Sequence, residues 1–126
     1  DSMTATFSVA GFSNAVLADV ETSGESIKVV GNLCLILQKG FYSIRHSHLK
    51  DDKTQTGLCI RVGSESGAPA EDHACAYSST ASHFSVSNAK DLWLEEGAHV
   101  TLHNIKPGTV GAEAPMWHVF QIRRII

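Results

Sequence analysis

The chain has 126 residues, of which 43% are hydrophobic and 18% charged, and its formal net charge is −3. This composition excludes a disordered chain, and the negative balance excludes nucleic-acid binding as the main activity. The length predicts a single domain over residues 1–126, large enough to bury a hydrophobic core. The longest apolar run, residues 33–37, is too short to span a bilayer, so we expect no membrane insertion by this segment.

Short apolar segments separated by turn residues follow one another along the chain. Phe7, Val9 and Gly11 alternate with polar neighbours, and the later segments cover residues 27–30, 33–37, 41–49, 58–62, 74–77, 83–86, 99–105 and 117–126. Each has the length and the β-branched or aromatic content of a strand. Only residues 89–96 look helical, for two turns at most. Many short strands between frequent turns favour a β-sandwich or a barrel.

The alternation within the last strands predicts which side chains share a face. In residues 99–105, Val100 and Leu102 point to one side of the sheet, while His99 and His103 point to the other. In the last segment, His118, Phe120 and Ile122 lie opposite Trp117, Val119 and Gln121. Large apolar groups on both faces of that strand favour a packed sandwich whose outer face meets another subunit.

The three cysteines lie in three different segments. Cys34 is inside an apolar run and is expected to be buried. One disulfide plus one buried thiol would indicate an extracellular protein, and three free thiols a cytosolic one; we favour the first. The chain begins with Asp1 and has no signal peptide, so we expect a mature secreted form or a domain of a longer protein.

Seven histidines are an unusual number for this length. His46 and His48 should project from one face of a strand, and so should His99 and His103. Such pairs can bind zinc, but a site needs a third ligand. Asp72 and His73 are candidates, yet nothing in the spacing brings them close. We therefore expect histidines that face solvent or an interface, and no metal site.

Catalytic motifs are not found. The sequence has no Gly-x-Ser-x-Gly elbow, and residues 108–111 lack the strand-to-helix context of a phosphate-binding loop. The adjacent acid pairs at residues 51–52, 71–72 and 95–96 are typical of solvated turns. Cys34 lies in surroundings too apolar for a reactive thiolate. We expect a protein that is not an enzyme and that has no cofactor.

Several segments, taken in order, resemble a known superfamily. Residues 83–86 (HFSV) and 91–102 (DLWLEEGAHVTL) look like the strand, acidic-glycine turn and strand signature of the tumour necrosis factor and complement globular-head superfamily. Residues 38–44 (QKGFYSI) resemble its glycine–aromatic–tyrosine start of a central strand, and residues 5–9 (ATFSV) its opening strand. Residues 117–125 stand where its last aromatic strand would be. The resemblance covers most of the chain and implies an all-β jelly-roll β-sandwich of about ten short antiparallel strands.

The resemblance also implies an assembly and a set of contacts. Members of the family form trimers through aromatic surfaces, which by position would be Tyr42, Trp117 and Phe120 here; the alternative is that all three are core aromatics. Receptors of such ligands bind through loops between neighbouring subunits, which implies loops 51–56, 63–72 and 106–115 here. The candidate receptor contacts are Asp51, Asp52, Lys53, Glu65, Glu71, Lys106 and Glu113. A strand-linking disulfide found in some members implies a bond between Cys59 and Cys75.

These features together predict an extracellular ligand, secreted or part of a cell-surface ectodomain. It would form a homotrimer and cluster a cell-surface receptor of the tumour necrosis factor receptor type. The alternatives are a carbohydrate-binding lectin, a complement-head-like recognition module and a viral fibre head. Binding to a cysteine-rich receptor ectodomain would favour the first function, and binding to a glycan array would favour a lectin or a fibre head.

Overall fold

The computed structural model describes residues 1–50, 53–64, 67, 69–80, 84–111 and 118–126. These residues form eleven strands and no helix. The strands are β1 (Ser2–Ala10), β2 (Val16–Ser23), β3 (Ile27–Val30), β4 (Leu33–Ile36), β5 (Gly40–Lys50), β6 (Gly57–Ser64), β7 (Glu71–Tyr77), β8 (Phe84–Leu94), β9 (Ala98–Asn104), β10 (Thr109–Val110) and β11 (Val119–Arg124). A search of this part of the chain found no helix long and apolar enough to cross a membrane.

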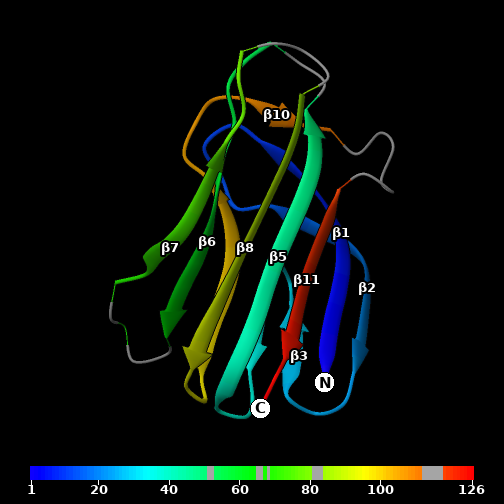
Figure 1. The fold of residues 1–126 in the computed structure, drawn as a ribbon, viewed down its shortest axis with the longest axis vertical. Helices are drawn as coiled ribbons and strands as arrows, with labels where there is room; N and C mark the ends of the chain where they lie inside the picture. Colours follow the sequence, from blue (N-terminus) through cyan, green and yellow to red (C-terminus); the bar gives the residue numbers. More distant parts are fainter. Residues whose placement is uncertain (51–52, 65–66, 68, 81–83, 112–117) are drawn as a thin grey trace.

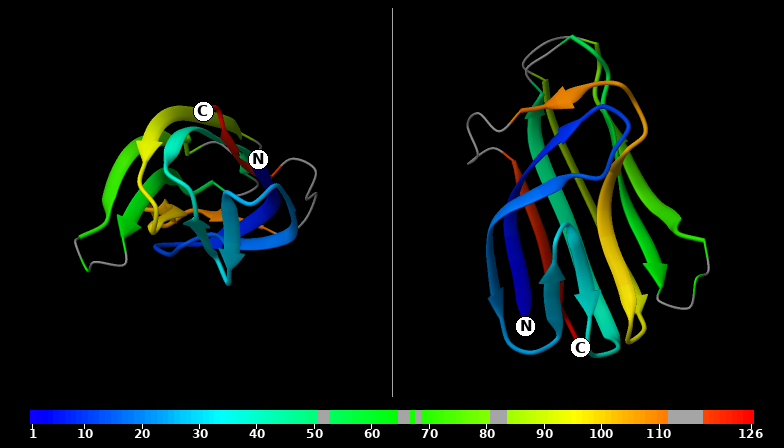
Figure 2. Two further views of the ribbon diagram at one scale, coloured as in Figure 1. Left: turned by 90° about the horizontal axis from the view of Figure 1, so that it is seen from below. Right: turned by 180° about the vertical axis from the view of Figure 1, so that it is seen from behind.

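The strands form two sheets that pack face to face (Figures 1 and 2). In the front sheet of Figure 1 the order is β2-β1-β11-β5-β8, and β10 pairs with the last two residues of β1. In the back sheet the order is β3-β4-β9-β6-β7. All of these pairs are antiparallel, and several join strands far apart in the sequence, such as β1 with β11. The predicted all-β jelly-roll sandwich is confirmed.

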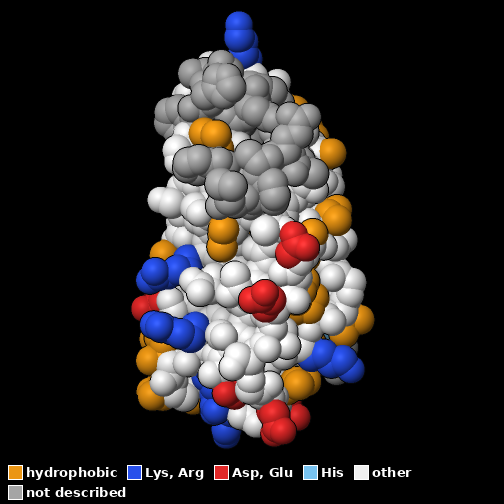
Figure 3. Space-filling view, turned by 90° about the vertical axis from the view of Figure 1, so that its right-hand side faces the viewer, with side chains coloured by type: hydrophobic (Ala, Val, Ile, Leu, Met, Phe, Trp, Pro, Cys, Tyr) orange, Lys and Arg blue, Asp and Glu red, His pale blue; other side chains and the backbone are white. Residues whose placement is uncertain are grey.

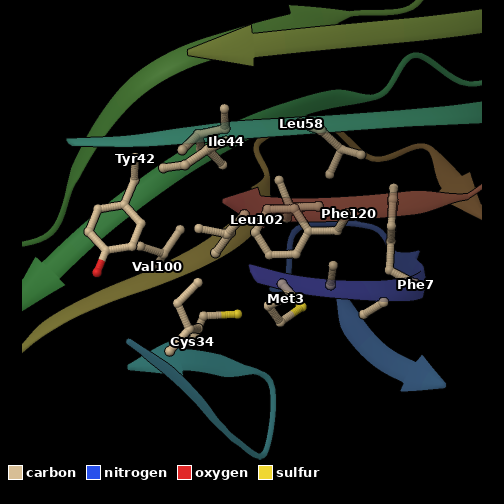
Figure 4. Close-up of a cluster of buried hydrophobic side chains, with 14 of the residues drawn as sticks. Met3, Phe7, Cys34, Tyr42, Ile44, Leu58, Val100, Leu102 and Phe120 are labelled. Atoms are coloured by element: carbon tan, nitrogen blue, oxygen red, sulfur yellow. The ribbon is translucent and has the colours of Figure 1, made fainter. Parts of the chain in front are cut away.

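The hydrophobic core lies between the sheets because side chains alternate along each strand. On β1 the odd-numbered residues from Met3 to Val9 are buried, and on β9 Val100 and Leu102 are buried. Phe120 from β11, the strand beside β1 in the front sheet, packs with them, and Figure 4 shows the side chains pointing toward one another. The faces predicted for Val100, Leu102 and Phe120 are therefore confirmed.

Strand β8 is longer than the sequence predicts. The helix-like interpretation of residues 89–96 is wrong, because β8 continues to Leu94 and the residues that follow form a turn. The strand is held by an unbroken antiparallel register with β5, from Gly40 opposite Leu94 to Lys50 opposite Phe84. Tertiary pairing thus overrides a weak local helical preference.

Strand β2 was not predicted, and its residues, half of them apolar, are almost all exposed. It is an edge strand that pairs only with β1 among the described residues. Its register on β1 shifts between Thr4 and Thr6, and Asp19 beside this irregularity has a positive φ of 48°. A strand without a core face gives no alternating pattern to read.

The two chain ends lie at the same end of the sandwich (Figure 1). The backbone N–H of Arg124 donates to the carbonyl of Asp1 over 2.9 Å. The guanidinium of Arg124 donates to Gln38 Oε1 over 3.0 Å and to the Lys39 carbonyl over 2.8 Å. The last residues of the chain are thereby fixed beside the start of β5.

Candidate assembly face and histidine cluster

The outward face of the front sheet consists of the side chains of β1, β11, β5 and β8 that point away from the core. The register places Arg45 between Gln121 and Ala89, and Ser43 between Arg123 and Asp91. A groove of about 610 Å³ hollows this face, lined by Arg45, His46, Ser47, Ser87, Asn88, Ala89, Val119 and Gln121. Most of the residues along it are polar.

Aromatic and aliphatic residues lie close together near one end of this face. Phe41 on β5 lies directly opposite Trp93 on β8, whose side chain is 54% exposed. Backbone hydrogen bonds of 2.7 and 2.8 Å join Phe41 to Ile125 and Ile126, which are both exposed. The Trp93 indole N–H donates to Glu95 Oε1 over 2.9 Å. We call Phe41, Trp93, Ile125 and Ile126 the apolar end of the outward face.

The predicted interface aromatics lie elsewhere. Tyr42 and Phe120 have 0% exposed surface and pack in the core (Figure 4). The Tyr42 hydroxyl donates to the carbonyl of Gln38, and burial raises its pKa. Neither ring can contact another subunit while the sandwich is packed in this way. Both are core aromatics, which was the alternative to the interface role. Trp117 lies outside the described residues.

Three histidines surround one phenylalanine inside the sandwich. The ring of Phe7 lies 6.5, 6.1 and 6.0 Å from those of His46, His48 and His118. All three histidines are at most 2% exposed, so the prediction of solvent or interface positions is wrong for His46 and His48. His46 and His48 are at inward-facing positions of β5, and His118 is the residue before β11. We call these four residues the histidine cluster.

The members of the histidine cluster differ in their hydrogen bonds. His118 Nε2 donates to the Leu49 carbonyl over 3.1 Å, and His48 Nε2 lies 3.3 Å from Thr56 Oγ1. Neither ring nitrogen of His46 has a hydrogen-bond partner among the described residues. Burial lowers the pKa of His46 to about 4, so the ring is neutral at pH 7.

The other predicted histidine pair lies on the back sheet, where His99 and His103 share the outward side of β9 as predicted. His103 Nδ1 is 2.7 Å from Asn14 Oδ1, and burial followed by the nearby Arg61 charge lowers the pKa of His103. Arg61 Nε donates to Asp72 Oδ1 over 2.8 Å in a two-pronged ion pair, and this hydrogen bond lowers the pKa of Asp72.

The predicted disulfide is confirmed, since Cys59 on β6 and Cys75 on β7 are directly opposite each other and joined. The third cysteine, Cys34, is a buried free thiol whose pKa burial raises to about 12. Among the described residues, the one group with metal-ligand spacing is Cys59, Asp72 and Cys75. Its two sulfurs form the disulfide and are not thiolate ligands.

The predicted receptor-contact loops do not all lie together. The segment before β6 contacts the β9–β10 connection, because Gly108 N–H donates to the Gln55 carbonyl over 2.9 Å. Lys53 and Lys106 belong to these two neighbouring segments, and Lys106 Nζ lies 6.0 Å from the Tyr77 ring centroid. Glu71 begins β7 at the opposite end of the sandwich (Figure 1). Asp51, Asp52, Glu65 and Glu113 lie outside the described residues.

Sequence comparison finds no matching family model and no matching curated protein. Solved structures, however, match almost the whole chain. Murine APRIL at pH 8.5 has a TM-score of 0.78 and 13% identity, with 99% of this chain and 100% of that chain covered. Eiger TNF from S. frugiperda has a TM-score of 0.74 and 10% identity, with 99% and 91% covered. At these identities the likeness is one of fold, and the chain has the fold of a tumour necrosis factor-like ligand domain.

Proposed function

We propose that this protein is an extracellular ligand that forms a homotrimer and clusters a cell-surface receptor of the tumour necrosis factor receptor type. It acts by binding and not by catalysis. The observation that carries the proposal is the tumour necrosis factor-like fold, which extends over 99% of the chain. The disulfide between Cys59 and Cys75 supports an oxidising, extracellular location, secreted or on a cell-surface ectodomain.

The outward face of the front sheet is the proposed trimer interface. Its apolar end presents Trp93 and Ile126, with 54% and 76% of their surfaces exposed. Soluble monomers rarely leave a group of large apolar side chains in water, and aromatic anchors are enriched at the centres of interfaces. The interface aromatics in this assignment are Phe41 and Trp93, in place of Tyr42 and Phe120.

Clustering follows from threefold symmetry. A trimer would present three equivalent receptor sites, so a second receptor on the same membrane would bind at a high effective concentration. The avidity would exceed the affinity of one site, and the receptors would be gathered in the membrane. No chemical step is needed for this activity.

The receptor contacts are proposed for the end of the sandwich where Lys53 and Lys106 lie. Lys53 is exposed, and Lys106 is in the neighbouring segment that Gly108 joins to Gln55. Asp51, Asp52 and Glu113 are proposed as receptor contacts as well. Glu71, the first residue of β7, would form a separate contact because it lies at the other end of the sandwich. Glu65 is proposed as a further receptor contact.

Binding to immobilised cysteine-rich receptor ectodomains tests this function, with a glycan array as the opposing arm. We expect binding to at least one ectodomain, and weaker binding by Lys53→Glu and Lys106→Glu. Lys28→Glu, an exposed change on β3 of the back sheet, is the control and should bind like the unchanged protein. Binding to glycans without binding to any ectodomain would contradict the proposal and favour a lectin or fibre head.

A further inference from the structure

A small polar pocket lies in the outward face of the front sheet, beside the groove described above. Its volume is about 60 Å³, and its lining residues are Ser43, Arg45, Gln121 and Arg123. The larger groove shares Arg45 and Gln121 with it, so the two hollows adjoin. The pocket suits a compact ion better than an extended chain.

The strand register explains why two arginines border one pocket. Arg45 is directly opposite Gln121, and Arg123 is directly opposite Ser43, on the adjacent strands β5 and β11. The arginines are therefore diagonal neighbours on one face, within reach of each other's long side chains. Like charges placed so close repel each other unless a counter-charge lies between them.

The described residues supply little counter-charge. Neither Arg45 nor Arg123 forms an ion pair or a side-chain hydrogen bond with another described residue. On β11, β5 and β8 the one acidic side chain of this face, among the described residues, is Asp91. It is a diagonal neighbour of Arg45 without forming an ion pair with it, and it is separated from Arg123 by the strand that carries Ser43. Two strand spacings amount to roughly 10 Å. Glu21 on the edge strand β2 is directly opposite Thr4 on β1, and strands β1 and β11 separate it from Arg45 on β5.

The neighbouring side of the molecule carries both acidic and basic side chains. Figure 3 shows acidic groups in the middle and at the bottom of that side, and Lys and Arg groups mostly toward its margins, with an acidic group among the basic ones at the left.

The pocket lining matches the needs of an oxyanion. Each guanidinium offers a rigid fork of N–H donors, and Ser43 and Gln121 add a hydroxyl and an amide donor. An arginine fork binds two oxygens of one oxyanion better than it binds a spherical ion such as chloride. Two guanidinium groups together favour an ion of charge −2.

We propose that this pocket binds a tetrahedral oxyanion, sulfate or phosphate, and that the bound ion stabilises the trimer. The inference rests on the proposed function, because it concerns the face that a trimer would bury. On β5, β11 and β8, two arginines and one aspartate leave an excess of +1 in each copy, and therefore +3 over these strands in a trimer. The acidic Asp19 and Glu21 belong to the β2 edge of the sheet. Burying unpaired charge is unfavourable, and a bound oxyanion removes that penalty.

The test is the dissociation of the assembly on dilution, followed by light scattering in chloride and in low millimolar sulfate or phosphate at equal ionic strength. We expect the oxyanion to lower the midpoint concentration of dissociation by roughly tenfold. Arg45→Gln and Arg123→Gln should abolish this difference between the salts. Lys28→Gln on β3 should retain it and so controls for a general effect of sulfate on burial.

Three results would overturn the inference. The first is a trimer equally stable in both salts, and the second is a sulfate effect that persists in both arginine variants. The third is dissociation caused by Asp91→Asn without any effect of the anion, which would assign the counter-charge to the carboxylate of a neighbouring copy. Each of these leaves the trimer, and with it the proposed function, intact. A monomer in every buffer would instead overturn the proposed function together with this inference.

Discussion

His46 combines two properties that make the protein sensitive to acid. Its ring is 2% exposed, and neither ring nitrogen has a hydrogen-bond partner among the described residues. Its neighbours in the cluster are the rings of Phe7 and His48, and burial is the cause that holds its pKa near 4. No described carboxylate faces it to stabilise a protonated ring. Protonation of His46 therefore works against the folded state.

We predict that stability falls between about pH 6.5 and pH 4. The unfolded chain binds a proton at His46 with an ordinary pKa near 6.5, whereas the folded chain binds it only near pH 4. The stabilisation is complete above pH 6.5, is lost as the pH falls toward 4, and amounts to about 3 kcal/mol. Urea unfolding at a fixed protein concentration across this range measures it.

The control for this prediction is His46→Leu, which removes the titrating group and should flatten the curve between pH 6.5 and 4. His73→Gln, a change at an exposed residue of β7, should leave the curve unchanged. If His46→Leu kept the full pH dependence, the acid sensitivity would have to be assigned to other groups.

Asn104 is a second residue whose role comes from its buried hydrogen bonds. Its side-chain amide donates to the carbonyls of Gly11 and Gly108 over 2.9 and 2.8 Å. Its side-chain oxygen accepts from the N–H groups of Gly57 and Lys106 over 2.9 and 3.2 Å. One side chain thus joins the end of β1, the start of β6 and the β9–β10 connection.

We predict that Asn104→Ala destabilises the protein by about 3 kcal/mol, because it leaves several buried backbone groups without a partner. It should also weaken receptor binding, since it loosens the connection that carries Lys106. Chemical unfolding and the ectodomain assay measure the two effects. Asn14→Ala, which removes one exposed hydrogen bond to His103, is the matched control and should change stability by less than about 1 kcal/mol.

At the scale of strands, the sequence predicts an element well when turn residues bound it and one of its faces is buried. The predicted range 27–30 coincides with β3, between Gly24 and Gly31, which both have positive φ. Strand β2 escaped prediction because it has no buried face, and β8 because its length depends on pairing with β5. Strand pairing is a long-range property that local patterns do not contain.

The hairpin of β6 and β7 depends on the disulfide at the edge of the back sheet. Cys59 and Cys75 are 16 residues apart, and among the described residues β7 has no strand partner in its sheet other than β6. We predict that Cys59→Ala with Cys75→Ala lowers the free energy of unfolding by about 3 kcal/mol, the entropy of closing a loop of this size. Urea unfolding without reductant measures this loss.

Adding reductant provides the control for the disulfide. It should destabilise the unchanged protein to a similar extent and have no further effect on the double variant. An equal response of both proteins to reductant would show that the loss arises elsewhere.

At the scale of the whole molecule, the interface aromatic proposed on β5 is the residue next to the predicted one. Phe41 and Tyr42 are adjacent aromatics on β5, and successive side chains point to opposite faces. The sequence identifies the aromatic strand, but the face of each ring depends on which sheet covers it. The structure places Tyr42 in the core and Phe41 on the outward face. The histidine cluster was missed for the same reason, since its rings are brought together by three strands or strand ends.

We predict that Trp93→Asp prevents assembly without unfolding the protein. The side chain is 54% exposed in the single chain, so the change costs the fold little. Loss of a buried aromatic anchor should weaken each interface by at least about 2 kcal/mol. Sedimentation velocity measures the assembly, and circular dichroism checks the fold. Val30→Asp, a change at a residue with a similar exposure of 53% on the back sheet, is the control and should leave assembly intact.

The most direct test of the central proposal is the mass of the unmodified protein in solution, measured by light scattering over a wide range of concentrations. One chain has a mass of 13.5 kDa, and the proposal predicts a stable species of three times that mass. A species of 13.5 kDa at every concentration would contradict threefold receptor clustering. So would a stable dimer, which could keep the fold but could not present three equivalent sites.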